Sequence, residues 1–101
     1  MPNFVKVAEK KDVPVGEGRC VDANGKIIAL FNVGGTFYAI DNTCVHREGP
    51  LGEGSLEGAV VTCPWHGWQY DVTTGVSPVN PTAKVPSFPV KIEGEIVYVG
   101  L

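Results

Sequence analysis

Both histidines of this 101-residue chain lie beside cysteines, in two short runs of sequence. The first run is Cys44-Val45-His46, and the second, Cys63-Pro64-Trp65-His66, begins after sixteen further residues. A mixed cysteine–histidine pair that is repeated across a gap indicates a metal centre with two unlike ends. Because such a centre needs ligands from both runs, the fold must bring two separate loops face to face.

The order of the ligands distinguishes between kinds of metal site. Two cysteines and two histidines also bind structural zinc, but zinc fingers usually group the cysteines in one run and the histidines in another. Here each run is mixed, so two facing loops can give each of two metal ions one ligand from each loop. A further alternative is that the four residues are unrelated members of the core. It is disfavoured because both histidines and two of the three cysteines fall in this one pattern.

The strings CVHREGPLGEGSLEG and VVTCPWHGWQYD resemble the Rieske family. The resemblance is specific in these two strings, and the flanking strand pattern fits the family's β fold over nearly the whole chain. It implies one Rieske-type [2Fe–2S] cluster per chain, with Cys44 and Cys63 binding one iron and His46 and His66 binding the other.

Short β-rich runs separated by glycine and proline predict an all-β fold, either a multi-stranded sandwich or a partly open barrel. Asn24-Gly25 and Gly34-Gly35 are two-residue hairpin signals, and Glu93-Gly94-Glu95 predicts a third turn. The expected strands are residues 4–8, 19–23, 26–33, 36–41, 59–62, 68–72, 88–93 and 95–99. Residues 1–101 are expected to form one domain, in which residues 42–82 make a small loop-rich subdomain that holds the cluster.

Charge and composition limit the possible partners and compartments. The net charge of −3 and the pI near 5.2 argue against a nucleic acid or an anionic membrane as partner. Three cysteines cannot form a closed disulfide framework, and no apolar stretch approaches the ~20 residues of a membrane span. The start of the chain lacks the apolar segment of a signal peptide. We therefore expect a cytoplasmic, monomeric protein.

Four positions beside the ligands bear on the reduction potential. Relative to high-potential Rieske proteins, Gly49 and Trp65 replace the cysteines of a loop-bridging disulfide, and Trp68 replaces a serine that donates to sulfur. Fewer donors to sulfur lower the potential, so we expect a low to intermediate value. Tyr70 matches a tyrosine that donates to a cluster cysteine, although a half-buried strand aromatic is an equal alternative. Trp65 and Trp68 are expected to shield the cluster from water.

Other residues have structural or partner-selecting interpretations. Gly67 would let the backbone approach the cluster closely. Pro81 belongs either to a third covering loop or to an ordinary surface turn. Cys20 is expected to be a buried, inert thiol in a strand. Arg47 and Glu48 stand beside His46 in the first run, where they are available to help select a partner.

Counting histidines separates a carrier from an oxygenase. Ring-hydroxylating oxygenases with Rieske domains also need a mononuclear iron held by two histidines and a carboxylate, and this chain has no histidine left for one. We therefore predict a one-electron carrier and not an enzyme, which passes electrons from a flavin-dependent ferredoxin reductase to a terminal oxygenase. The alternatives are the small subunit of an NAD(P)H nitrite reductase and a zinc-stabilised binding module.

Overall fold

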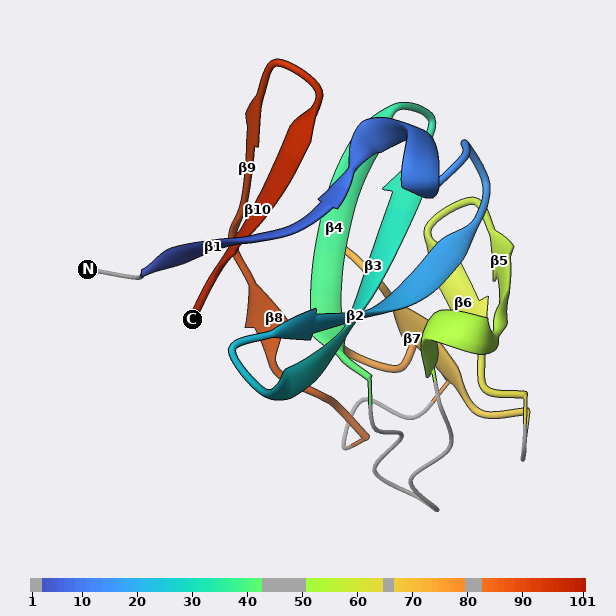
Figure 1. Ribbon diagram of the computed structural model, residues 1–101. Helices are drawn as coiled ribbons and strands as arrows, with labels where there is room; N and C mark the ends of the chain where they lie inside the picture. Colours follow the sequence, from blue (N-terminus) through green and yellow to red (C-terminus); the bar gives the residue numbers. More distant parts are fainter. Residues whose placement is uncertain (1–2, 43–50, 65–66, 80–82) are drawn as a thin grey trace.

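A four-stranded antiparallel sheet forms the centre of the fold (Figure 1). The computed structural model describes residues 3–42, 51–64, 67–79 and 83–101. The central sheet has the order β2-β3-β4-β8 and consists of Gly18–Ala23, Lys26–Val33, Thr36–Asp41 and Ser87–Phe88. Its first three strands are consecutive in the chain, as expected for strands that are joined by tight hairpins.

Two of the predicted hairpin turns are confirmed by their backbone conformation. Ala23 pairs with Lys26 and Val33 pairs with Thr36, so each turn contains two residues. Asn24 and Gly25 have φ values of 56° and 88°, and the two glycines of the next turn have φ values of 60° and 100°. Positive φ at both central residues is the type I′ geometry, whose twist matches that of the strands it joins.

Two smaller antiparallel sheets lie on either side of the central sheet (Figure 1). One has the order β1-β10-β9 and joins Phe4–Glu9 to Ile96–Gly100 and Val90–Glu93. The other has the order β5-β6-β7 and contains Ser55–Glu57, Val60–Thr62 and Gln69–Asp71. Two three-residue 3₁₀ helices, η1 (Lys10–Asp12) and η2 (Leu51–Glu53), connect sheets. Among the described residues no helix is long and apolar enough to cross a membrane.

The central sheet is buried on both faces, which explains the nearly continuous apolar run of β3. The loop-side core lies against β5–β7, and the terminal-strand core lies against β1, β9 and β10. Alternate residues of β3 enter the two cores. Ala29 and Phe31 belong to the loop-side core, and Ile28 and Leu30 belong to the terminal-strand core. The loop-side core comprises Ala29, Phe31, Ile40, Leu51, Val61, Cys63, Tyr70, Val72, Ala83 and Val85. The terminal-strand core comprises Ala8, Val13, Ala23, Ile28, Leu30, Phe37, Ala39, Val97 and Val99.

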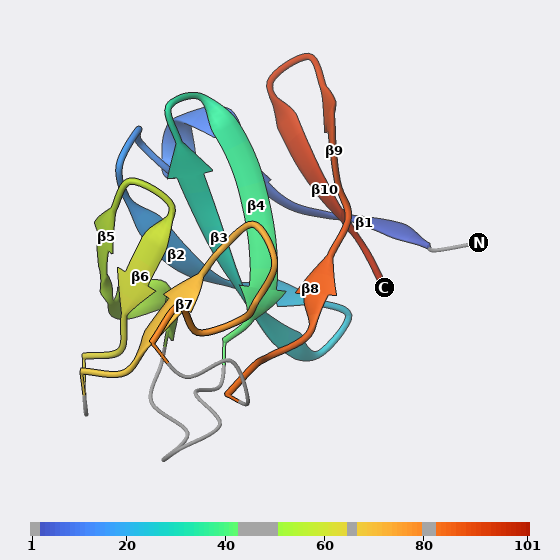
Figure 2. The same ribbon diagram turned by 180° about the vertical axis from the view of Figure 1, so that it is seen from behind.

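The all-β prediction is confirmed, and the structure is an open arrangement of sheets rather than a closed barrel. One predicted strand, residues 88–93, is wrong because it is split at Pro89. The preceding residues form β8 and pair with β4, whereas the following ones form β9 and pair with β10. Figure 2 shows the chain passing from β8 into β9. Proline lacks the N–H that a continuous ladder needs, so the chain changes sheet there.

Candidate metal centre

The second cysteine–histidine run is the connection of a β-hairpin. Thr62 of β6 pairs with Gln69 of β7, and beyond this pair the Cys63 N–H donates to the Trp68 carbonyl over 2.7 Å. The Gly67 N–H donates to the Cys63 carbonyl over 3.0 Å, so the described residues at the two ends of this connection are bonded to each other. Gly67 has a φ of +73°, and an added Cβ would meet no atom of the described residues within 4 Å, so this backbone conformation favours glycine there.

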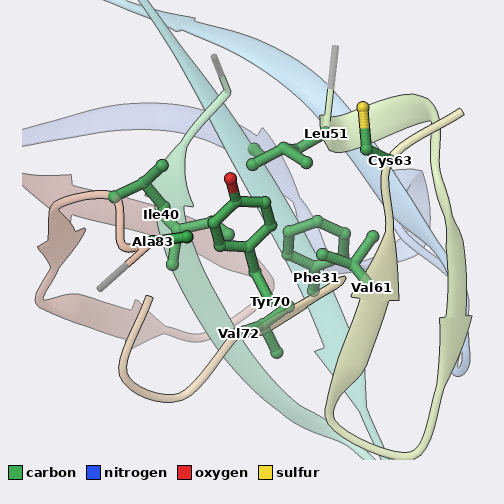
Figure 3. Packing of buried hydrophobic residues seen from close by; sticks show 10 residues of the cluster. Phe31, Ile40, Leu51, Val61, Cys63, Tyr70, Val72 and Ala83 are labelled. Atoms are coloured by element: carbon green, nitrogen blue, oxygen red, sulfur yellow. The ribbon is translucent and has the colours of Figure 1, made fainter. Parts of the chain in front are cut away.

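Cys63 is held at the end of the loop-side core. Its residue is only 2% exposed, and it packs in the same cluster as Leu51 and Tyr70. Figure 3 shows the Cys63 sulfur and the Tyr70 hydroxyl pointing toward the same end of this core. Cys63 is a free cysteine. The second run therefore presents a fixed, shielded thiol at the boundary of the core.

In the sequence the first run lies between β4 and η2, and the described residues on either side of it meet at Asn42. The Leu51 N–H donates to the Asn42 carbonyl over 2.8 Å, and the Gly52 N–H donates to the Asn42 Oδ1 over 2.7 Å. Cys44 and His46 lie between these ends, outside the described residues, as does His66 of the second run. The structure places Cys63 and the residues that flank the two runs. The complete ligand set stays a prediction.

A third segment closes beside the second run. The Ser77 N–H donates to the Ala83 carbonyl over 2.9 Å, and the Val79 N–H donates to the Ser77 Oγ over 3.3 Å. Residues of both segments line one cavity of about 290 Å³: Gly67, Trp68, Gln69, Ser77 and Val79. The predicted third loop thus starts next to the second run. Pro81 itself lies outside the described residues.

The structure corrects two further predictions about side chains. Tyr70 is fully buried in β7 and is not a half-buried strand aromatic. Cys20 does lie in a strand, but it is exposed. The reason is that β2 is an edge strand whose loop-side face borders an open cavity of about 430 Å³. Partial burial and the negative charge of Glu53 raise the pKa of the Cys20 thiol.

The remaining predictions near the site have mixed outcomes. Trp68 is half-buried against the loop-side core, in keeping with a shielding role. Trp65, Arg47, Glu48 and Gly49 lie outside the described residues. Sequence reasoning missed Asn42, whose only local signal is a residue type that often caps loops through its side chain.

The described residues fit an iron–sulfur centre. Cys63 offers a soft thiolate ligand of the kind that binds clusters, and burial limits its contact with water. Each of the three segments described above has a residue of the loop-side core at one end. These residues are Leu51, Cys63 and Ala83. The ends of these segments are therefore held by one packed unit.

Comparison with known proteins identifies the family. Residues 3–89 match the model of the Rieske [2Fe-2S] domain. The chain belongs to the Rieske [2Fe-2S] domain family. Its cofactor is accordingly a Rieske-type [2Fe–2S] cluster, and the zinc alternative is wrong.

Relatives of similar length show the role of this Rieske protein. It is 41% identical over 92 residues to the ferredoxin component of the naphthalene 1,2-dioxygenase/salicylate 5-hydroxylase systems of Ralstonia sp, covering 90% of this chain and 88% of the relative. It is 41% identical over 101 residues to the 3-phenylpropionate/cinnamic acid dioxygenase ferredoxin subunit of Escherichia coli K12, covering 98% and 94%. This Rieske protein is an electron carrier and not itself a catalytic enzyme.

A solved structure agrees with this family assignment. A chain in the complex of reduced oxygenase and oxidized ferredoxin in carbazole 1,9a-dioxygenase superposes with a TM-score of 0.85 at 35% identity. The match covers 96% of the present chain and 92% of that chain. The described fold is thus that of a Rieske ferredoxin along nearly its whole length.

Proposed function

We propose that this Rieske protein takes one electron from a flavin-dependent ferredoxin reductase and passes it to the terminal oxygenase of a ring-hydroxylating dioxygenase system. The observation that carries the proposal is the near full-length similarity to ferredoxin components of such systems. The similarity to a chain from a complex of oxygenase and ferredoxin supports the second transfer. The relatives' names favour this role over that of a nitrite reductase subunit.

Four residues are proposed to hold the cluster, with Cys44 and Cys63 on one iron and His46 and His66 on the other. The position of Cys63 supports this assignment, because its thiol is buried at the end of the core where the first segment returns at Leu51. Residues 1–101 are proposed to form a single domain, with residues 42–82 as its cluster-binding part. The separate sheet β5-β6-β7 supports that division.

The neutral imidazole ligands determine the net charge of the cluster and therefore its reduction potential. With two thiolates and two imidazoles, the oxidised centre carries no net charge and gains one negative charge on reduction. Reduction is therefore easier than at a centre with four thiolates, and the potential falls in the range of roughly −150 to +300 mV. The missing disulfide and serine donor favour the lower part of this range.

Two cysteine variants test the ligand assignment within one chain. The wild-type protein is expected to be red-brown and to give a rhombic EPR signal when it is reduced. Cys63→Ser should lose this signal and the iron, whereas Cys20→Ser should keep both. Retention of a normal cluster in Cys63→Ser would contradict the assignment.

Stopped-flow mixing tests the role of the carrier. Reduced protein should be reoxidised by a ring-hydroxylating oxygenase, and oxidised protein should be reduced by a flavin-dependent reductase with NADH. Transfer to a sirohaem nitrite reductase subunit but to no oxygenase would support the alternative. We also propose a cytoplasmic monomer, which cell fractionation and light scattering would test.

A further inference from the structure

The segment that carries two of the four proposed ligands is preceded by an asparagine, and the residues that follow the segment bind to this asparagine. In the sequence, residues 43–50 connect Asn42, which follows β4, to Leu51 and Gly52 of η2. The carbonyl of Asn42 accepts from the Leu51 N–H over 2.8 Å, and its side-chain Oδ1 accepts from the Gly52 N–H over 2.7 Å. A single residue thus binds both N–H groups of the returning chain.

A third contact ties this asparagine to β2, which lies on the other side of β3 in the central sheet. The Cys20 Sγ donates to the same Oδ1 over 3.2 Å, from its place in edge strand β2. Because Oδ1 accepts from two different elements, its orientation is defined by both. We call Cys20, Asn42, Leu51 and Gly52 the Asn42 clamp.

Close packing holds the returning chain against β2. A Cβ added to Gly52 would lie 2.8 Å from the carbonyl carbon of Arg19 and 2.8 Å from the backbone nitrogen of Cys20. Real Cβ atoms do not approach backbone so closely, so any larger residue would push the chain away from β2. Glycine is therefore required here by contact and not by its φ value.

We propose that the Asn42 clamp is a positioning device for the first ligand segment, which fixes both of its ends and thereby holds the iron–sulfur cluster in place. This inference rests on the proposed ligand role of Cys44 and His46. The clamp acts through the ligands, because none of its members is itself a proposed ligand. Fixing both ends of a loop limits how far its ligands move, and limited movement is what a preorganised metal site needs.

The ionisation of Cys20 is consistent with its part in the clamp. A thiol donates a hydrogen bond, whereas a thiolate cannot. Burial and the charge of Glu53 raise the pKa of Cys20 by more than its hydrogen bonds with Asn42 and Gly52 lower it, so the donating form is retained at neutral pH. A serine at this position would also donate, and an alanine would not.

Graded substitutions in the holoprotein measure the effect of the clamp. Asn42→Ala removes the acceptor for Gly52 and Cys20, and we expect chelator-driven cluster loss to be about tenfold faster, as for the loss of roughly one to two net hydrogen bonds. Asn42→Asp keeps the acceptor and should recover most of the wild-type rate. Cys20→Ala should accelerate loss about two- to threefold, since it removes one weak donor, and Cys20→Ser should not.

A spectroscopic reading separates positioning from general stability. The EPR signal of reduced Asn42→Ala should be broadened, because ligands held less firmly sample more geometries. Asn32→Ala is the matched control: it removes a buried amide that donates to the Val13 carbonyl over 2.8 Å and accepts from the Gly35 N–H over 2.8 Å. It lies near the opposite end of the β3–β4 hairpin and should lower the melting temperature without broadening the signal.

Two results would refute the proposal that the Asn42 clamp positions the first ligand segment. One is a wild-type rate of cluster loss and an unchanged EPR signal in Asn42→Ala. The other is equal broadening in Asn32→Ala. Should Asn42→Ala fail to fold, the comparison of Cys20→Ala with Cys20→Ser still decides, and equal rates in that pair would count against the clamp. A wild-type protein without any Rieske signal would instead refute the ligand assignment on which the clamp rests.

Discussion

Substitution of Gly67 by alanine tests whether the backbone of the second run is tied to the cluster. Gly67 and Gly94 make a matched pair, because their φ values are +73° and +62° and an added Cβ would meet no atom of the described residues within 4 Å at either site. Alanine at each position therefore introduces backbone strain without a steric clash against the part of the chain that the structure describes.

The magnitude follows from two opposing effects on stability. The left-handed conformation costs a non-glycine residue roughly 1–2 kcal/mol. Restricting the unfolded chain returns about 0.4–1 kcal/mol. The net loss is about 1 kcal/mol for either variant, which lowers the melting temperature of a domain of this size by roughly 4–8 °C.

The two variants should differ only in how they hold the cluster. Gly67 also donates to the Cys63 carbonyl over 3.0 Å, so relaxation of the strain there loosens the turn that positions Cys63. Thermal melting followed by circular dichroism measures stability, and bleaching of visible absorbance in chelator measures cluster loss. We expect similar melting temperatures, but faster cluster loss in Gly67→Ala alone. Equal bleaching rates in the two variants would refute the link between this turn and the cluster.

Two further predictions concern the core and Cys20. Phe31→Ala, at a fully buried position between two sheets, should destabilise the protein by about 3–5 kcal/mol in urea unfolding, and a loss below about 1 kcal/mol would contradict the packing described. Alkylation of Cys20 by iodoacetamide should be slow at neutral pH and should accelerate as the pH rises toward its raised pKa, because the thiolate is the nucleophile. The sign for stability follows: the contribution of Cys20 is present below its ordinary pKa and is lost as the pH rises through the raised one. Fast alkylation at pH 7 would show that the thiol is not protected in this way.

Local signals in the sequence were sufficient for much of the fold and for part of the site. Asn24-Gly25 and Gly34-Gly35 predict their turns because these residue types readily adopt the positive φ values that the turns require. The second run could be assigned to a connection between two strands because the β-rich residues 59–62 and 68–72 flank it. The sheet to which Phe88 pairs could not be predicted, because that choice depends on contacts with β4, far away in the sequence.

Side-chain roles that depend on tertiary contacts were the least predictable. Cys20 is apolar enough to suggest burial, but its exposure follows from the position of β2 at the edge of the central sheet. The residue type of Asn42 does not reveal which groups it binds, since its partners Cys20 and Gly52 lie 22 and 10 residues away. Such positions become visible only once the sheets are assembled.

The double burial of the central sheet has a consequence for how this sequence can diverge. The starting points of the ligand-bearing segments rest on the loop-side core, whereas Val97 and Val99 belong to the terminal-strand core across the sheet. Substitutions in contact with different neighbours combine almost additively. Mutational drift in the terminal-strand core is therefore largely insulated from the redox site, and it changes how long the carrier survives rather than how readily it gives up its electron.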